Sequence, residues 1–295
     1  MRITPNNAGL GARIEGIDLA QPLSPADYRT VLAALGQYGV LCFPGQDLGA
    51  PQLSAFGSRF GDLEVNVANL FHAPDHPEVM ILSNQRDAAG RPIGLNDAGQ
   101  GWHTDMSYST EIALANALHA KQVPSRDGRP LGDTQFRNMH AAYDDLPPEV
   151  VQRLEGRVAI HDFEKFWDVM RMRPGSIRGP LTEAQKAKKP PVRQPIFRIH
   201  PITGRRVLYC NPGYAMHIEG LERAESDAML EYLFRHQAQE KYLYSHAWTP
   251  GDLLMWDNIG TCHNAVADYR PDEPRFILRV QVMATLDYAA MLQAA

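Results

Sequence analysis

Short apolar segments recur along most of the chain, and residues typical of turns separate them. Thr203-Gly204 lies between two of these segments and Pro250-Gly251-Asp252 between two more, as in hairpins. Many short strands with few helices predict a mainly β fold, with two sheets packed face to face and helices flanking them. The predicted strands are residues 79–82, 113–120, 133–136, 157–160, 196–199, 207–210, 243–248, 253–256 and 276–282.

Helical periodicity is confined to three places. Ser24 and Pro25 have the residue types of an N-cap and a first helical position, and Gly39 ends the apolar pattern that follows them. A second helix is predicted from about Pro51 to Gly61, and a third over residues 222–237.

Two long stretches show neither the helical nor the strand periodicity of apolar residues. Residues 83–101 and residues 170–195 are called here the first and second lid segments, and the second is rich in Pro, Lys and Arg. A solvated insertion explains such a composition. That explanation is favoured for the composition of the second segment. Long loops in a compact domain are otherwise often lids, so we also predict that both segments are mobile and lie over the site.

The composition limits the classes of protein that the chain can belong to. All 295 residues fit one domain, and a net charge of −5 argues against a nucleic-acid partner. No apolar run approaches the roughly 18 residues that a membrane span needs, and no signal pattern opens the chain. Three cysteines without CxxC spacing predict neither a disulfide framework nor a zinc-cysteine site. We therefore expect a reduced, cytoplasmic enzyme that acts on a small molecule and forms a homo-oligomer.

The sequence Trp102-His103-Thr104-Asp105 is the sharpest local motif. On a strand, His103 and Asp105 would point to the same face and could reach one metal ion. His76-Pro77-Glu78 and His217-Ile218-Glu219 have the same spacing, and such pairs arise by chance in a chain with 11 histidines. Pro77 disfavours a regular central strand and His217 lies in an irregular Pro-Gly-Tyr segment, so His103 and Asp105 are favoured as metal ligands.

A second histidine completes a possible metal site. His263 follows a turn, an apolar strand and another turn, and this return would bring it beside the preceding strands. Two histidines and one carboxylate leave three positions open on an Fe(II) ion. Arg275 and Arg279 lie four residues apart on a predicted strand, among apolar neighbours. They are either surface arginines or, as we favour, inward-facing groups that need anionic partners.

With these residues, the chain resembles the taurine/2,4-D dioxygenase family of Fe(II)- and 2-oxoglutarate-dependent oxygenases. The resemblance covers nearly the whole chain and rests on an ordered set of modest motifs. They are Leu10-Gly11-Ala12, the strand 40–43, Trp102-His103-Thr104-Asp105, Gly132-Asp133-Thr134, Ala141-Ala142-Tyr143, His200-Pro201-Ile202-Thr203-Gly204, Trp256-Asp257-Asn258, His263, Asp268-Tyr269, Arg275 and Arg279.

The resemblance implies a double-stranded β-helix, or jelly roll, that hydroxylates a substrate while 2-oxoglutarate and O2 yield succinate and CO2. It implies that His103, Asp105 and His263 are the catalytic iron ligands. Thr134 and Arg275 match the residues that hold the distal carboxylate of 2-oxoglutarate, and Arg279 matches a substrate-binding arginine. An arginine fork and a threonine hydroxyl are suited to a carboxylate.

Further site residues are predicted less directly. Asn116 is a polar residue among apolar neighbours on one strand, and it either contacts 2-oxoglutarate or substrate or is structural. His217 falls where related enzymes approach substrate, although a structural role is as compatible with the sequence. Gly99 and Phe166 align where taurine enzymes have polar groups. Phe163, Phe166 and Trp167 are therefore predicted to line a more apolar substrate pocket, unless they pack in the core. We therefore expect a small organic anion, a carboxylate or a sulfonate or sulfate, as substrate.

Two other functions use the same features. One is a jelly-roll metalloenzyme of another class, an isomerase or hydrolase, which Arg275 and Thr134 disfavour because they presuppose a dicarboxylate. The other is an inactive binding protein on the same fold, which the intact set of metal ligands disfavours.

Overall fold

The computed structural model describes residues 1–6, 9–65, 71–173, 176 and 178–293. Eight strands form the larger sheet in the order β1-β2-β3-β16-β6-β18-β5-β4. Neighbouring strands are antiparallel except β2 and β3, which are parallel. The strands are β1 (Arg2–Pro5), β2 (Ala12–Glu15), β3 (Val40–Phe43), β16 (Leu253–Asp257), β6 (Ala113–Gln122), β18 (Phe276–Met283), β5 (His76–Ser83) and β4 (His72–Ala73).

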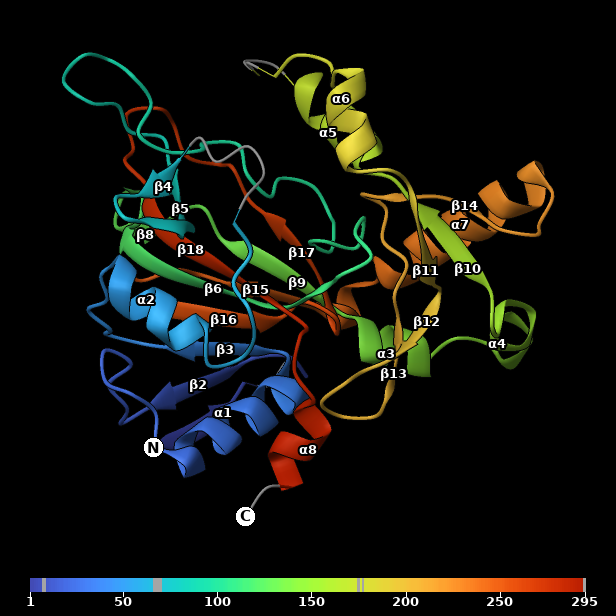
Figure 1. Cartoon of the computed structure of the whole chain (residues 1–295), viewed down its shortest axis with the longest axis horizontal. Coiled ribbons are helices and arrows are strands. Elements are labelled where there is room, and N and C mark those ends of the chain that lie inside the picture. The colour runs from blue at the N-terminus through green and yellow to red at the C-terminus, as the bar shows by residue number, and fades with distance from the viewer. Residues whose placement is uncertain (7–8, 66–70, 174–175, 177, 294–295) are drawn as a thin grey trace.

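A smaller antiparallel sheet completes the jelly roll. It consists of β15 (Leu243–His246), β9 (Thr134–Asn138) and β17 (Thr261–Ala265), with β9 in the middle. Side chains of both sheets form one apolar cluster between them, and Figure 1 shows the small sheet beside the centre of the large one. The mainly β jelly roll predicted from the sequence is therefore confirmed.

Both faces of the central strands are buried, which explains their continuous apolar sequences. In β3, Val40 and Cys42 point to the space between the sheets, whereas Leu41 and Phe43 belong to the cluster on the other face. This alternation is the two-residue period of a strand. Helices α1 (Pro25–Tyr38) and α2 (Ala50–Gly57) cover that other face, as Figure 1 shows.

The beginning and end of α1 follow the signals in the sequence. The Ser24 side chain accepts a hydrogen bond from the Asp27 backbone N–H at 3.1 Å, and Pro25 occupies the first turn. Gly39 has φ of 68° and donates its N–H to the Leu35 carbonyl at 2.9 Å, a conformation that suits glycine at a helix end.

The remaining elements form a second group of strands and helices, which lies to the right in Figure 1. Its sheet has the order β11-β10-β14, and β12 pairs with β13. Here α7 packs against β14. The bounds are β10 (Val158–His161), β11 (Val192–Pro195), β14 (Ala215–Ile218), β12 (Phe197–Ile199), β13 (Arg206–Leu208), α3 (Met139–Asp144), α4 (Pro148–Leu154), α5 (Phe163–Arg171), α6 (Glu183–Lys188), α7 (Arg223–Gln237) and η1 (Glu240–Tyr242). The short β7 (Ser125–Arg126) pairs with β8 (Arg129–Pro130), and α8 (Tyr288–Gln293) lies against α1.

Several sequence expectations need correction. Pro77 does not exclude a strand, because β5 begins at His76 and holds Pro77 as its second residue. The second predicted helix ends at Gly57, before Gly61. The second lid segment is not aperiodic throughout, because it contains α6 and β11. The Thr182 side chain accepts from the Gln185 backbone N–H, a capping box that opens α6.

Candidate metal and cosubstrate site

The two histidines of the candidate site lie on neighbouring backbone segments. His263 is the middle residue of β17, and His103 faces it in an isolated pair. The N–H of each donates to the carbonyl of the other, at 3.0 and 2.9 Å. The chain turns directly after His103, and Met106 has φ of 57°. Asp105 therefore reaches the histidines through a turn, and the same-face argument from a continuous strand was wrong.

The side chains of these three residues converge on one point. Nε2 of His103 lies 3.4 Å from Oδ1 of Asp105, and Nε2 of His263 lies 3.5 Å from Oδ2. One donor atom from each residue lies within 4.8 Å of the other two. The two imidazole rings are 4.2 Å apart between centroids, and both are buried.

Hydrogen bonding and burial leave each residue in the form that binds a metal ion. Nδ1 of His103 is 2.7 Å from the Gly101 carbonyl, which can only accept, so Nδ1 carries a proton and Nε2 is the ring nitrogen available to a metal ion. Burial, with the neighbouring His103 and Arg279, holds the pKa of His263 well below its usual range, so its ring is neutral. Burial alone would raise the pKa of Asp105, but the Arg279 guanidinium and the two histidines lower it strongly, and the carboxyl is ionised.

This donor set fits a divalent transition metal. Two neutral imidazole nitrogens and one carboxylate on one side of an ion form the facial triad of non-haem Fe(II) oxygenases. Nδ1 of His263 is buried without a hydrogen-bond partner among the described residues. No protein hydrogen bond to Nδ1 therefore fixes which of the two ring nitrogens of His263 faces a metal ion.

Asn258 fixes the position of Asp105, although sequence reasoning gave it no role beyond a motif. Its Nδ2 donates to the Asp105 carbonyl at 2.8 Å and to the Ala113 carbonyl at 3.2 Å, while its Oδ1 accepts from the Asp105 N–H at 3.2 Å. Asn258 is fully buried. The signal in the sequence that could have indicated this role was a polar residue directly after the apolar strand β16.

Arg275 and Thr134 are the two groups predicted to bind the cosubstrate carboxylate, and Arg275 lies near Gly132, in the segment that leads into β9 at Thr134. A side chain added at Gly132, two residues before Thr134, would meet Nε of Arg275 at 3.5 Å. Arg275 is only 8% exposed, burial lowers its pKa, and no described carboxylate forms an ion pair with it. Oγ1 of Thr134 accepts from Nε1 of Trp248 at 3.1 Å, which leaves the hydroxyl proton free to donate. The pair therefore offers a buried positive charge and a hydroxyl donor to an anion.

Arg279 and Asn116 lie on the other side of Asp105. Nη2 of Arg279 is 2.7 Å from Oδ2 of Asp105, and Oδ1 of Asn116 accepts from Nε and Nη2 of Arg279 at 3.1 and 2.8 Å. Arg279 thus already has an anionic partner, so an unpaired buried charge no longer supports the prediction that it binds substrate. Oδ1 of Asn116 also accepts from Gln281, so that oxygen orients Arg279. The ligand-binding roles of both residues stay predictions.

An aromatic wall stands next to the three converging residues. The Phe166 ring lies 4.8 Å from the His103 ring, and Tyr214 lies 5.2 Å from Phe166. Tyr108 is 4.7 Å from Tyr214, and Phe163 is 4.8 Å from Tyr108. We call Tyr108, Phe163, Phe166 and Tyr214 the aromatic wall. No role was predicted for the two tyrosines, because their positions depend on the packing of α5 against the turn after His103.

The structure does not bring His217 into contact with this site. It lies in β14, opposite Ile160 of β10, within the second group of strands in Figure 1. Among the described residues it forms no ion pair or ring contact with His103, Asp105 or His263. His217 itself lies in β14, although the pairing of β14 with β10 is irregular next to it, between Ile160 and His161.

The two lid segments contact each other close to the site. Arg178 donates two hydrogen bonds to Asp97 at 2.9 and 2.7 Å, and Arg173 donates to Gln100. Gly101, whose carbonyl fixes His103, directly follows Gln100. Residues 174–175 and 177 of the second lid segment lie outside the described part of the chain. That the segments move stays a prediction.

A jelly roll with two histidines and a carboxylate around one point is the architecture of mononuclear non-haem oxygenases. Comparison with known proteins agrees with this class. The chain belongs to the family described as "Taurine catabolism dioxygenase TauD, TfdA family", whose model matches residues 2–281.

The names of similar proteins indicate the class of reaction. The chain is 35% identical to the alpha-ketoglutarate-dependent 2,4-dichlorophenoxyacetate dioxygenase of Cupriavidus pinatubonensis, over 85% of this chain and 87% of that protein. It is 33% identical to pentalenolactone F synthase of Streptomyces avermitilis, over 92% and 90%. A crystal structure of a taurine dioxygenase from Burkholderia xenovorans superposes with a TM-score of 0.75, at 29% identity, over 96% of this chain and 90% of that one. The predicted family and the class of 2-oxoglutarate-dependent dioxygenases are confirmed.

No helix in the described part of the chain has the length and apolar character that crossing a bilayer requires.

Proposed function

We propose that His103, Asp105 and His263 hold Fe(II) and that the chain hydroxylates a small organic anion with an aromatic body. The observation that carries the metal site is the convergence of two Nε2 atoms on one ionised carboxylate, at 3.4 and 3.5 Å. Arg279 donates a hydrogen bond to that carboxylate, and Asn258 fixes the Asp105 backbone through its N–H and its carbonyl. A bound ferrous ion supplies the redox chemistry by which O2 and 2-oxoglutarate become succinate and CO2 while a substrate C–H becomes C–OH.

Arg275 and Thr134 are proposed to bind the distal carboxylate of 2-oxoglutarate. A buried guanidinium without an ion-pair partner is costly, and an incoming carboxylate compensates its charge. The planar fork of arginine matches a carboxylate through two parallel hydrogen bonds. The Thr134 hydroxyl donates a further hydrogen bond, because Trp248 already occupies one of its acceptor sites.

The aromatic wall and Arg279 are proposed to bind the primary substrate. The wall offers apolar surface next to His103 and excludes water from that side of the site. Nη1 of Arg279 forms no hydrogen bond with the described residues, while Nε and Nη2 are bound to Asn116 and Asp105. Arg279 can therefore hold Asp105 and still donate to an anion. The name of the 2,4-dichlorophenoxyacetate relative is consistent with an aryloxy acid.

The test is succinate release with Fe(II), 2-oxoglutarate and three matched compounds. Phenoxyacetate combines the aryl body and the carboxylate, phenoxyacetamide replaces the charge by a neutral amide, and taurine lacks the aryl body. We expect phenoxyacetate to stimulate turnover most, and Phe166→Ala to lower that stimulation at least tenfold. Stronger stimulation by the amide than by the acid would contradict the anion-binding role of Arg279. Stronger stimulation by taurine would contradict the role of the aromatic wall.

Two further properties belong to the same proposal. The chain is proposed to be a homo-oligomer, which light scattering tests against the 32.9 kDa mass of one chain. A reducing, cytoplasmic location is supported by the free, buried state of Cys42, Cys210 and Cys262. Fractionation of cells that produce the protein tests the location.

A further inference from the structure

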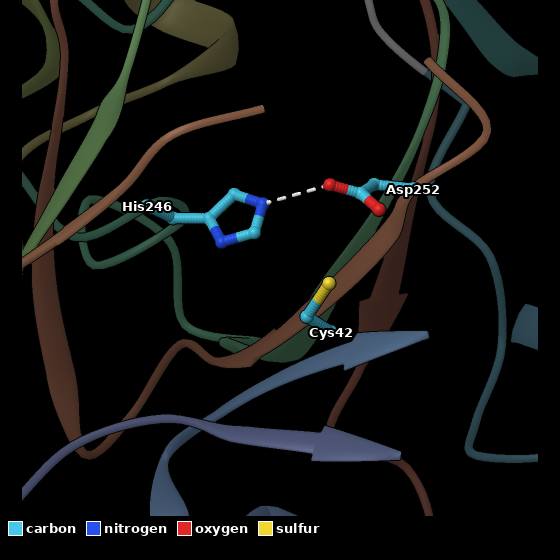
Figure 2. A group of neighbouring side chains, drawn as sticks. All are labelled: Cys42, His246 and Asp252. Carbon is cyan, nitrogen blue, oxygen red and sulfur yellow. Dashed lines mark ion pairs between the residues drawn. The ribbon is translucent and has the colours of Figure 1, made fainter. Parts of the chain in front are cut away.

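A second cluster of metal-binding side chains lies between the two sheets. It consists of Cys42, His246 and Asp252, and their donor atoms lie within 4.8 Å of one another. Figure 2 shows the His246 ring pointing toward the Asp252 carboxylate, with the Cys42 sulfur beside both. Cys42 and His246 are each 7% exposed and Asp252 is 3% exposed. The cluster shares no residue with the site built around His103, Asp105 and His263.

The spacing within this cluster resembles that of the first site. Nε2 of His246 lies 3.4 Å from Oδ2 of Asp252, compared with 3.4 and 3.5 Å between the histidines and Asp105. A tetrahedral zinc ion with bonds of about 2.0–2.1 Å separates its nitrogen and oxygen ligands by about 3.4 Å. The same separation is long for a hydrogen bond between these atoms.

His246 has an unsatisfied nitrogen that points into the cluster. Nε2 is buried and has no hydrogen-bond partner among the described residues. Its other nitrogen, Nδ1, lies 3.3 Å from the Tyr244 hydroxyl. That hydroxyl can accept a proton from Nδ1, which would leave the Nε2 lone pair for a metal ion and hold the ring in place.

A third buried cluster shows why geometry alone is insufficient. His140, His200 and Asp257 also lie within 4.8 Å of one another. Nδ1 of His200 accepts backbone N–H bonds from Ile202 and Thr203, both at 3.3 Å. Nε2 of His200 must then carry the proton, and it lies 2.9 Å from Oδ2 of Asp257. This cluster is an internal His–Asp pair, whereas no such backbone donor fixes the proton of His246.

We propose that Cys42, His246 and Asp252 bind a second divalent transition metal, with zinc(II) the favoured ion. A thiolate, an imidazole and a carboxylate together match zinc, and three protein ligands leave a fourth position for water. The ion joins the two sheets, because Cys42 lies in β3 and Asp252 precedes β16, whereas His246 ends β15. His246 also pairs across the small sheet with Thr134, so the ion stiffens the wall of the cosubstrate pocket.

Cobalt(II) provides a spectroscopic test that does not depend on activity. The full chain is freed of metal with a chelator and titrated with cobalt(II) in the wild type and in His103→Ala, which lacks one ligand of the first site. We expect a thiolate-to-cobalt charge-transfer band in both proteins, and one bound equivalent in the variant. The band is lost in Cys42→Ser and in His246→Gln. It is retained in Cys210→Ser, the matched control, because Cys210 is equally free and buried but lies outside the cluster.

Two further measurements complete the test. Zinc(II) is expected to raise the melting temperature of His103→Ala but not that of His103→Ala with Cys42→Ser. Tyr244→Phe is expected to weaken zinc binding about tenfold, the lower range for loss of an outer hydrogen bond to a ligand. No charge-transfer band in the folded wild type, or an unchanged band in Cys42→Ser, overturns the proposal. If Cys42→Ser does not fold, the wild-type and His246→Gln spectra decide.

Discussion

Arg275→Leu should weaken 2-oxoglutarate binding strongly without destabilising the protein in the absence of ligand. In the structure Arg275 is buried and has no ion-pair partner among the described carboxylates. Tyr269 contacts the guanidinium, but no described carboxylate neutralises it, so the native state carries a desolvation cost that a bound anion offsets further. Leucine removes that cost, so the melting temperature without metal or cosubstrate should stay the same or rise.

The size of the binding defect follows from the bonds that are lost. A hydrogen bond to a charged group contributes about 1.5–3 kcal/mol, and a bidentate arginine forms two of them. A loss of at least about 3 kcal/mol corresponds to about 100-fold weaker binding. Arg275→Lys keeps the charge but loses the fork, so its defect should fall between those of the wild type and the leucine variant.

Calorimetric titration with 2-oxoglutarate under anaerobic conditions measures this loss directly. Arg126→Leu is the control, because Arg126 is more exposed and pairs with Glu273 at 2.7 Å. That variant should bind 2-oxoglutarate as the wild type does. Unchanged affinity in Arg275→Leu would refute the assignment of the cosubstrate carboxylate to Arg275. A large fall in melting temperature would refute the argument that its charge is unpaired.

Other predictions follow from single contacts. Gly213→Ala would place a methyl group 2.8 Å from Cβ of His103, so activity should fall at least tenfold, whereas Gly179→Ala, with open space around it, should be neutral in the same succinate assay. Arg178→Ala removes the ion pair between the two lid segments and should speed their cleavage in limited proteolysis. In the wild type, iron, 2-oxoglutarate and substrate together should slow this cleavage. Equal cleavage rates in all of these samples would argue against lids. Burial lowers the pKa of His161 to about 3, so below about pH 6.5 the unfolded chain binds a proton that the folded protein does not. As the pH is lowered below about 6.5, His161 should therefore reduce the free energy of unfolding of the metal-free protein by up to about 1.4 kcal/mol per pH unit. Denaturant titrations should show a shallower pH dependence in His161→Gln.

Local sequence signals predicted the parts of the fold that depend on nearby residues. Ser24, Pro25 and Gly39 mark α1 because capping acts within one turn of helix. The strands β6, β16 and β18 were predicted because their sequences are largely apolar and lie between residues typical of turns. The capping box that opens α6 was also local, at Thr182 and Gln185, and was overlooked.

The contacts within the site could not be predicted in the same way. Arg279 and Asp105 lie 174 residues apart, and their ion pair depends on where β18 places Arg279 beside the turn that holds Asp105. The spacing of Arg275 and Arg279 on one strand indicated that a buried Arg279 needs an anionic partner. It did not indicate that Asp105 of the same chain is that partner. The aromatic wall likewise depends on the packing of α5, which tertiary structure decides.

Succinate formation from 2-oxoglutarate with added Fe(II) tests most directly whether His103, Asp105 and His263 form the metal site. His76→Ala is the matched control, because His76 has the same spacing to Glu78 but lies in β5. The wild type and His76→Ala should form succinate only when Fe(II) is present. His103→Ala and His263→Ala should form none above the protein-free background while they keep the circular dichroism spectrum of the wild type. Full iron-dependent activity in either of these two variants would contradict the proposed site.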